Sequence, residues 1–539
     1  MPTARPDRTP ARRAELVKAL MEAAAYPHEV ERPVRLVETH ISHLFLTGEY
    51  VYKIKKPVDL GFLDFTTLER RRRFTSDELE LNRATSPDVY LGISEVRRGA
   101  DGRLRMDGDG EVEEYALKMR QLAADDVLVR LVLDGRAGTR QMALLGRYLA
   151  RFHGRASPAA TDSEHGGPDV VRKLVFDNLA AVGPWAAPLS FSDQVGRVAA
   201  YTQGAVQALR PLIAARKAAG WVRDCHGDLH ADNIFLERRS ARGPGRAGRL
   251  VIQIIDRIEF SDRYRFIDVA SDLAFLTMDL KRLRRPDLAD ALVLAYLDDR
   301  EDPELRTMMR FYEVYRAMVR CKVAVLRRPP EAATAREYAG LAARLVAAQR
   351  PQAMFVMTGV AGSGKSTVAQ ELAGRWGIRH VSSDVVRKTL FGLDPHRPSD
   401  PSVRDQLYSP RMSGATYREL VRQGEEELAA GRSVVLDASF LKRDHRKRAR
   451  MAALRRGIPF LVIECRLDSK EARARLRRRY ASGKSESDAG PELLAYHLSE
   501  RQAVSPQECY GHVVVDTSGD PGLYMDEAEA EMWRQLLRP

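Results

Sequence analysis

Cysteine is scarce in this sequence, and long apolar runs are missing from it. The chain has four cysteines in 539 residues, without paired or metal-type spacing, so reduced thiols of a cytosolic protein are the simplest explanation. No segment approaches the roughly 18–20 uninterrupted apolar residues of a membrane span. The basic N-terminus is not followed by an apolar run and does not look like a secretory signal. We therefore expect a cytoplasmic protein that does not contact a membrane.

Charge of neither sign dominates the chain. The sequence has 87 basic and 74 acidic residues, which gives a net charge of +13. This modest excess favours anionic ligands such as nucleotide phosphates, and it leaves nucleic-acid binding possible without favouring it. The length is too great for one ordinary domain.

The most informative stretch is the polar loop at residues 226–233. It places Asp228 and Asn233 five residues apart, and the apolar run at 250–255 ends in Asp256. Kinase-type phosphoryl transfer needs one Asp for the acceptor proton, and an Asn plus a second Asp for the metal. We assign Asp228 as the base that accepts or orients the acceptor proton, and Asn233 and Asp256 as ligands of Mg²⁺. The alternative is a loop whose Asp and Asn only make turn hydrogen bonds.

The pattern His226-x-Asp228-x4-Asn233, followed by Asp256, resembles the catalytic core of the aminoglycoside phosphotransferase family. These are small-molecule kinases with a protein-kinase-like, two-lobed fold, and the resemblance covers about the first two thirds of the chain. It implies a strand lysine that neutralises the nucleotide phosphates. The predicted strand at 50–55 carries Lys53 and Lys55 on one face. We choose Lys53, with Lys55 in reserve; the alternative is a solvated edge-strand lysine.

The resemblance also implies a helix whose glutamate pairs with that lysine. The pattern at 68–82 predicts a helix that carries Glu78 and Glu80. Two residues apart on a helix point in different directions, so only one can serve, and we favour Glu78. The hairpin at 47–49 has a single glycine, unlike the Gly-rich loop of protein kinases. That departure favours the aminoglycoside branch.

A second nucleotide motif lies in the last third of the chain. An apolar strand is predicted at 354–358 and a helix at 368–376, and between them stands a complete G-x-x-x-x-G-K-[ST] motif. In such a loop backbone N–H groups surround phosphate oxygens, Lys365 neutralises the β- and γ-phosphates, and Ser366 offers a hydroxyl to Mg²⁺. The predicted ATP-binding residues are Gly359, Val360, Ala361, Gly362, Ser363, Gly364, Lys365, Ser366 and Thr367.

Four further residues are candidates for this second site. Asp384 follows a predicted strand, where it could orient an acceptor hydroxyl or equally serve as a helix N-cap. Asp437 ends another apolar strand, as expected of a partner for Mg²⁺ and its waters. Arg475 and Arg479 share one face of an Arg-dense helix at 471–480, which resembles a lid over the transferring phosphate.

The last third is similar to small P-loop kinases, including polynucleotide 5′-kinase-like, gluconate-kinase-like and zeta-toxin-like enzymes. The tandem order resembles a family of two-domain bacterial proteins. We therefore expect an α+β two-lobed protein-kinase-like domain followed by an α/β P-loop domain with a mostly parallel sheet. The predicted boundaries are 1–29 for an N-terminal extension, 30–350 for the kinase-like domain with lobes 30–123 and 124–350, and 351–539 for the P-loop domain.

These patterns predict an ATP- and Mg²⁺-dependent phosphotransferase with two nucleotide sites. The first moves the γ-phosphoryl of ATP to a hydroxyl of a small polar acceptor, sugar-like or aminoglycoside-like, and the second uses another acceptor near Asp384. Three alternatives stay open: the P-loop half is an ATPase or nucleotide sensor that regulates the first half, the first half is a binding module with a vestigial site, or the basic lid holds a polynucleotide end. Because fold does not fix substrate, antibiotic resistance is not inferred.

Overall fold

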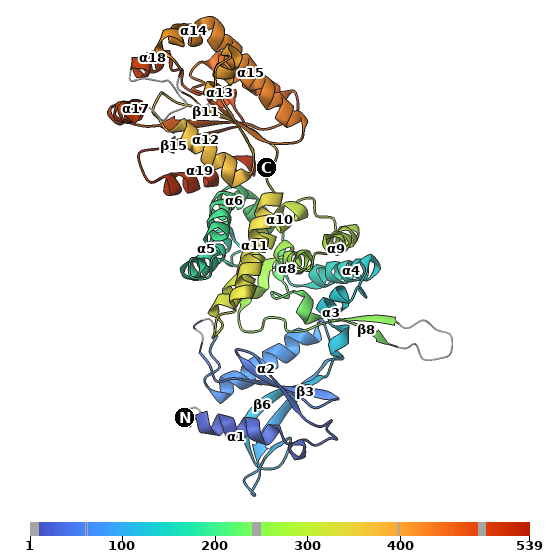
Figure 1. Cartoon of the computed structure of the whole chain (residues 1–539). Coiled ribbons are helices and arrows are strands. Elements are labelled where there is room, and N and C mark those ends of the chain that lie inside the picture. Colours follow the sequence, from blue (N-terminus) through green and yellow to red (C-terminus); the bar gives the residue numbers. More distant parts are fainter. Residues whose placement is uncertain are drawn as a thin grey trace. The chain divides into compact units, whose positions relative to one another are not determined.

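The computed structural model describes residues 10–538 except 60, 62, 240–248, 396, 398 and 483–491. The chain forms two compact units (Figure 1). The first unit comprises Met1–Leu174 and Ile213–Val323, and the second comprises Val175–Leu212 and Ala324–Pro539. Segments 175–212 and 324–350, which the sequence placed with the kinase-like domain, thus belong to the second compact unit.

The first lobe of the first unit is built on a six-stranded antiparallel sheet in the order β1-β2-β3-β6-β4-β5. Helix α1 belongs to its core, because Leu16 and Leu20 are buried with Phe45 and Tyr52. The predicted N-terminal extension therefore contributes to this lobe. The elements are α1 (Pro10–Leu20), η1 (Ala23–Ala25), β1 (Arg35–Glu38), β2 (Ser42–Leu46), β3 (Tyr50–Lys55), α2 (Leu68–Arg83), β4 (Tyr90–Arg98), β5 (Leu104–Met106) and β6 (Glu111–Arg120).

Helix α2 packs against β4 and β6, and its buried residues are all polar: Arg71, Thr75, Glu78 and Asn82. Thr67 caps its N-terminus, because its side chain accepts a hydrogen bond from the N–H of Arg70 at 3.3 Å. Arg71 is buried, and its Nε donates to Glu114 Oε2 at 3.0 Å. This buried ion pair fixes the helix on the sheet and directs Glu78 toward β3.

The second lobe is mainly helical, with two short antiparallel strand pairs that carry the polar loop. β8 pairs with β9, and β7 pairs with β10. Helices α4 and α9 approach closely at Gly146, where a Cβ would lie 2.3 Å from the carbonyl oxygen of Leu292. The elements are η2 (Ala124–Asp126), α3 (Leu128–Leu133), α4 (Thr139–Arg155), β7 (Val222–Asp224), η3 (Ala231–Asn233), β8 (Ile234–Arg239), β9 (Arg249–Ile254), α7 (Asp262–Arg265), β10 (Phe266–Asp268), α8 (Val269–Arg282), α9 (Pro286–Asp299) and α10 (Leu305–Leu326).

The second unit is built on a five-stranded sheet in the order β12-β13-β11-β14-β15, parallel throughout. The chain order of the strands reverses beside β11, and ligands of such sheets bind at the carboxyl ends of the strands near that point. The elements are α5 (Pro168–Ala186), α6 (Ser192–Ala218), α11 (Ala332–Ala348), β11 (Met354–Thr358), α12 (Lys365–Trp376), β12 (Arg379–Ser382), α13 (Ser383–Phe391), η4 (Pro401–Val403), α14 (Arg404–Leu407), α15 (Pro410–Ala429), β13 (Val434–Asp437), α16 (Arg443–Leu454), β14 (Phe460–Arg466), α17 (Ser469–Ser482), α18 (Glu492–Glu500), η5 (Pro506–Glu508), β15 (Gly511–Asp516) and α19 (Pro521–Leu536); α5 and α6 each begin or end in the first unit.

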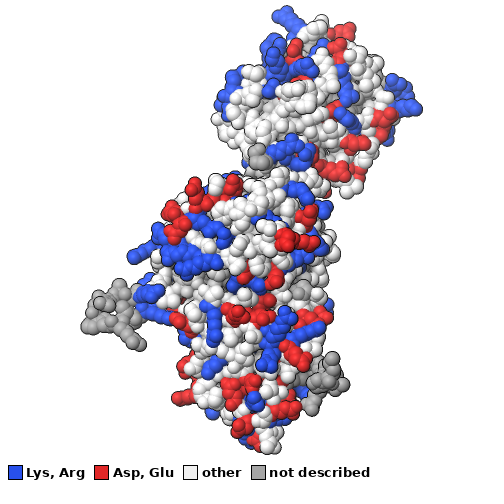
Figure 2. Space-filling model, turned by 180° about the vertical axis from the view of Figure 1, so that it is seen from behind, with Lys and Arg blue, Asp and Glu red and all other residues white. Residues whose placement is uncertain are grey.

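The expected fold class is confirmed for both parts of the chain. A two-lobed, kinase-like α+β unit and an α/β P-loop unit are present, and the sheet of the latter is wholly parallel. On the face drawn in Figure 2, basic and acidic side chains are interspersed over both units, as the modest net charge suggests. None of the helices within the described residues is long and apolar enough to cross a bilayer.

Candidate active sites

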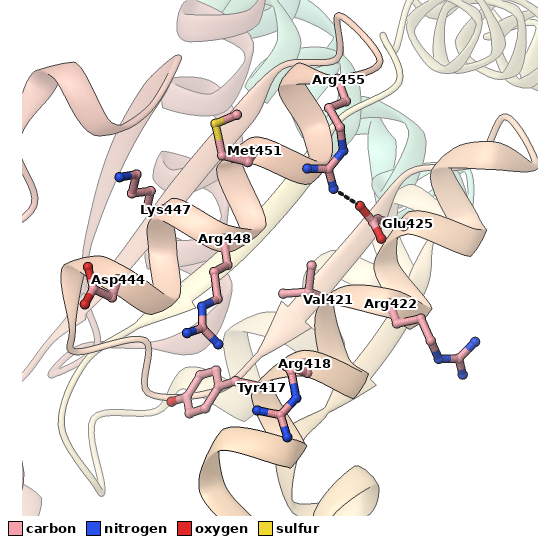
Figure 3. A pocket seen from close by; sticks show the side chains of 10 residues that line it. All are labelled: Tyr417, Arg418, Val421, Arg422, Glu425, Asp444, Lys447, Arg448, Met451 and Arg455. Carbon is pink, nitrogen blue, oxygen red and sulfur yellow. Dashed lines mark hydrogen bonds and ion pairs between the residues drawn. The ribbon is translucent and has the colours of Figure 1, made fainter.

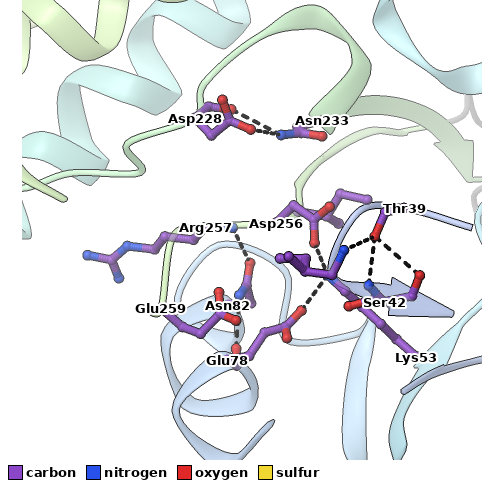
Figure 4. A network of polar contacts seen from close by, with 12 residues as sticks. Thr39, Ser42, Lys53, Glu78, Asn82, Asp228, Asn233, Asp256, Arg257 and Glu259 are labelled. Atoms are coloured by element: carbon purple, nitrogen blue, oxygen red, sulfur yellow. Dashed lines mark hydrogen bonds and ion pairs between the residues drawn. The ribbon is translucent and has the colours of Figure 1, made fainter. Parts of the chain in front are cut away.

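Lys53 on β3 is the centre of the first site. Its Nζ donates to Glu78 Oε1 at 2.7 Å and to Asp256 Oδ1 at 2.5 Å, as Figure 4 shows. Burial disfavours the charged amine, but the charges of Asp256 and Glu78 outweigh it and hold the pKa of Lys53 well above its ordinary value. Lys53 therefore remains a cation between a helix glutamate and the aspartate that follows β9.

Lys55 takes part in the same network. The sequence favours Lys53, with Lys55 in reserve, but both lysines bind Glu78. Its Nζ donates to Glu78 Oε2 at 2.6 Å and also to Glu259. Although burial raises the pKa of Glu78, the two lysines outweigh that effect and lower it to about 2. Glu80 is exposed, so Glu78 alone pairs with the strand lysines.

Asp256 is held in place by the region where α2 ends. Its backbone has a positive φ of 63°, which is uncommon for a residue with a side chain and costs of order 1 kcal/mol. Its N–H donates to the hydroxyl of Tyr90 at 3.0 Å, and the next N–H, of Arg257, donates to Asn82 Oδ1 at 2.9 Å. Arg257 also donates through Nε to the carbonyl oxygen of Cys225 at 3.0 Å, just before the polar loop. These contacts fix the Asp256 carboxylate beside the amine of Lys53.

The polar loop brings Asp228 and Asn233 together. Asn233 Nδ2 donates to the carbonyl oxygen of Asp228 at 3.0 Å, and it lies 3.4 Å from Asp228 Oδ2. The carbonyl oxygen of Asn233 accepts from the N–H of Ile255 at 2.9 Å. Asn233 is therefore tied by its backbone to the residue that precedes Asp256, and Figure 4 shows this pair and the Lys53 network in one view.

Asp272, near the start of α8, braces the polar loop by accepting hydrogen bonds from its backbone. Its two oxygens accept from the N–H of His226 at 3.0 Å and from the N–H of Gly227 at 2.9 Å. His153 is buried and its Nε2 lies 3.1 Å from Asp272 Oδ2, so this histidine supports the brace. His226 donates through Nε2 to the carbonyl oxygen of Ile255 at 2.9 Å. This contact ties the start of the polar loop to the residue that precedes Asp256.

Replacing Asp272 by Ala is expected to loosen the loop, because two buried N–H donors lose their acceptor. The cost is about 2 kcal/mol, so local opening becomes roughly 30-fold more frequent. Hydrogen–deuterium exchange of peptides covering residues 222–236 measures this. Asp290, exposed on α9, gives the matched control Asp290→Ala, which should leave the exchange unchanged. Equal exchange in the wild type and Asp272→Ala would contradict the bracing role.

The electrostatic surroundings of Asp228 keep it ionised. Burial disfavours its charge, but the His230 imidazole and the Arg320 guanidinium outweigh burial and lower the pKa of Asp228 below its ordinary value. In turn, Asp228 and Asp232 outweigh burial at His230 and raise its pKa to about 9. His230 Nε2 lies 3.4 Å from Asp228 Oδ2. A carboxylate held this acidic is suited to orienting a hydroxyl more than to removing a proton early.

The oxygens of Asn233 and Asp256 fit a magnesium ion. Mg²⁺ prefers a few hard oxygen ligands that leave room for water and substrate phosphate. The Asp256 side chain is 45% exposed. Its Oδ2 makes no hydrogen bond to any residue that the structure describes. Asn233 directs its amide nitrogen to Asp228, which leaves its amide oxygen as the atom that could bind a metal.

The second site is the loop between β11 and α12. Gly359, Gly362 and Gly364 have φ values of 145°, 79° and 82°. A Cβ on Gly359 would lie 2.6 Å from the carbonyl oxygen of Cys465, and one on Gly362 would lie 2.6 Å from that of Ala472. Only glycine meets both demands, so the loop can turn closely enough to direct its N–H groups to one point.

Two buried polar atoms of this loop fit an anion. Ser363 is fully buried, and its hydroxyl has no hydrogen-bond partner within the described part of the chain. Lys365 Nζ donates to the carbonyl oxygen of Val360 at 2.7 Å. Burial lowers the pKa of Lys365 even though Asp437 and Asp384 act to raise it, so a phosphate would stabilise its charge.

The four further candidates of the second site differ in their placement. Asp437 ends β13, is buried, and accepts from His380 Nε2 at 3.1 Å. Asp384 lies in the first turn of α13, whose N-cap is Ser382, so Asp384 is not the cap. Both carboxylates lie within electrostatic reach of Lys365.

The two lid arginines also differ. Arg475 is held by Glu471 at 2.9 Å and by the carbonyl oxygen of Thr517 at 2.8 Å, so it supports the end of β15 beside the loop. Arg479 acts to lower the pKa of Lys365 and therefore lies near it. Ser366 and Thr367 are exposed at the start of α12. The chain directly after α17, at 483–491, lies outside the described residues.

Comparison with known proteins gives one match to the phosphate loop and others to nearly the whole chain. A family described as "AAA domain" matches residues 354–503, which contain the whole phosphate loop. The protein named "Uncharacterized protein Rv2004c" of Mycobacterium tuberculosis is 31% identical over 522 residues, covering 95% of this chain and 98% of that protein; "Uncharacterized protein Mb2027c" of Mycobacterium bovis matches to the same extent. The chain belongs to the family of these mycobacterial proteins. Since the match spans nearly the full length, both units are part of the family.

Solved structures resemble the two units of this family separately. A gluconokinase from Sinorhizobium meliloti 1021 is 22% identical, with a TM-score of 0.24, and covers 35% of this chain and 95% of that one. The GDP and kanamycin complex of APH(2")-IIia is 14% identical, with a TM-score of 0.38, and covers 62% of this chain and 100% of that one. Both TM-scores are below 0.5, so the fold assignment rests on the topology of each unit.

Several residues around the sites were not predicted from the sequence. Glu259 and Tyr90 complete the lysine network, and His230 contacts Asp228. In the second site, His497 on α18 accepts the N–H of Ala361 through Nδ1 at 3.0 Å. Glu259 could have been noticed as an acid between apolar neighbours three residues after Asp256; the other contacts leave no local signal.

Proposed function

We propose that this chain is a phosphotransferase that uses ATP and Mg²⁺ at two separate sites. The observation that best supports the first site is the network of Lys53 with Glu78 and Asp256, which joins residues 203 positions apart in the chain. A strand lysine between a helix glutamate and a metal-binding aspartate is the arrangement on which kinase-type transfer depends. The intact residues Asp228 and Asn233 beside it favour an enzyme over a binding module.

Each residue of the first site has one task in this proposal. Asp228 orients the hydroxyl of a small polar acceptor, sugar-like or aminoglycoside-like, and takes its proton. That happens as the new O–P bond forms and the bond to the departing ADP breaks. Lys53 neutralises phosphate oxygens of the nucleotide, and Asn233 and Asp256 hold the metal. A magnesium ion held by Asn233 and Asp256 would supply positive charge that neutralises the charge developing on the transferring phosphate.

The second site is proposed to transfer phosphate to another hydroxyl acceptor. The loop from Gly359 to Thr367 binds the nucleotide phosphates through backbone N–H groups, and Lys365 adds a positive charge. Ser366 and Asp437 hold Mg²⁺, Asp384 orients the acceptor, and Arg479 closes over the transferring group together with Arg475. The match of residues 354–503 to the "AAA domain" family supports nucleotide binding there.

Transfer of labelled γ-phosphate tests the proposal. The full chain is incubated with labelled ATP and panels of sugars, aminoglycosides, nucleosides and short oligonucleotides. We expect one class of labelled product to disappear with Asp228→Ala and a different class with Lys365→Ala. Hydrolysis of ATP without any labelled acceptor would contradict it. A second unit that only senses nucleotide would keep its nucleotide response in Asp384→Asn.

A further inference from the structure

A groove lies between α15 and α16 of the second unit, and no residue of the phosphate loop lines it. Its volume is about 500 Å³, within the range of small-ligand pockets. Figure 3 shows that the two helices contribute its walls, and Val421 and Met451 are the two aliphatic residues of its lining. The lining residues are Tyr417, Arg418, Val421, Arg422, Glu425, Asp444, Lys447, Arg448, Met451 and Arg455.

The groove carries more positive charge than its own acids neutralise. Arg455 pairs with Glu425, and Arg422 pairs with two glutamates of its own helix, outside the lining set. Arg418, Lys447 and Arg448 form no ion pair or hydrogen bond with any residue that the structure describes. Asp444 is the one acid of the lining without an ion pair to a described residue, which leaves an excess of two positive charges.

The wall nearest the unpaired arginines is rigid. The Tyr417 ring stacks on His445 with ring centroids 3.8 Å apart, and its hydroxyl lies 3.1 Å from Ser439 Oγ. The N–H of Gly359, the first residue of the phosphate loop, donates to the carbonyl oxygen of Ser439 at 3.2 Å. Tyr417 therefore separates the groove from the second site while contacting the segment that supports it. Burial and the charge of Arg448 lower the pKa of His445, as expected in a positive potential.

We propose that this groove binds a small ligand carrying two or more phosphate groups. Like charges on facing helices repel one another, and a polyanion between them removes that cost. Arginine favours phosphate because its planar group donates two parallel hydrogen bonds to such oxygens. The volume of the open groove suits a small molecule, and none of its lining residues belongs to the phosphate loop or is Asp384 or Asp437.

Calorimetry with inorganic pyrophosphate tests this site. The full chain carries Lys365→Met, so that the phosphate loop contributes little, and it is compared with the same chain bearing Arg418→Gln and Arg448→Gln. The matched control bears Arg456→Gln and Arg473→Gln, which remove the same charge from exposed positions outside the groove. The substituted side chains are exposed, so folding is preserved, and thermal melting verifies this.

We expect the groove variant to bind pyrophosphate at least about tenfold more weakly, with the control within about twofold of the parent. Citrate, a tricarboxylate of similar charge, should bind more weakly than pyrophosphate. Equal loss in the control, or no loss in the groove variant, would overturn the proposal. Citrate binding as tightly as pyrophosphate would also overturn it. The same holds if the groove variant loses affinity only for a single-stranded oligonucleotide titrated in place of pyrophosphate.

Discussion

Replacing Asp228 by Asn is expected to lower turnover at the first site by about 100- to 10,000-fold, with nucleotide affinity little changed. The amide keeps the shape of the side chain and its contact with Asn233, but it can neither take a proton nor hold the charge that His230 and Arg320 stabilise. Steady-state rates with labelled ATP, and ADP binding by calorimetry, give the two readouts separately.

Asp232→Asn is the matched control, since Asp232 lies in the same loop, is exposed, and also contacts His230. It should keep turnover within about threefold of the wild type, because surface substitutions away from the reacting atoms have small effects. A similar loss in both variants would point to the loop's conformation and not to the chemistry of Asp228. Undiminished turnover in Asp228→Asn would remove it from the reaction.

Replacing Lys365 by Met is expected to weaken nucleotide binding at the second site by about 10- to 100-fold, as loss of a charge-assisted phosphate contact does. Lys365 is partly buried within electrostatic reach of Asp437 and Asp384, so its loss also removes a nearby positive charge from these two carboxylates. Titration of a fluorescent ATP analogue, with the first site silenced by Lys53→Met, measures the change.

Lys470→Met provides the control for that experiment. Lys470 is exposed near the start of α17, and the substitution removes the same charge from the same unit. Its affinity should equal that of the parent chain. If Lys470→Met weakens binding as much as Lys365→Met, general electrostatic attraction explains the result and the phosphate loop has no special part in it.

Local patterns predicted the residues that share one element or one loop. The alternation of β3 put Lys53 and Lys55 on one face, and the structure shows both bound to Glu78. The glycine and lysine spacing of the phosphate loop needed no distant information. On β3, however, the sequence treated Lys53 and Lys55 as alternatives. The carboxylate that gives Lys55 its second partner, Glu259, lies 204 positions further along the chain and could not be connected with β3 from the sequence.

Contacts between distant segments could not be predicted. Three side chains bind a backbone N–H or carbonyl group at a site, and backbone groups carry no sequence signal. They are the side chains of Tyr90, Arg257 and His497. Arg71 stands in a run of four consecutive arginines, a pattern typical of a solvated helix face, yet it is buried against Glu114. The predicted kinase-like domain, residues 30–350, also included segments 175–212 and 324–350, because the pattern of an amphipathic helix does not show with which unit the helix packs.

The number of nucleotides bound per chain tests the central claim, that this chain has two independent sites. Calorimetry with an unhydrolysable ATP analogue and Mg²⁺ should give two per wild-type chain. Lys53→Met and Lys365→Met should each leave one, and the double variant none. A single nucleotide per wild-type chain, or the loss of both sites on either single substitution, would contradict the claim.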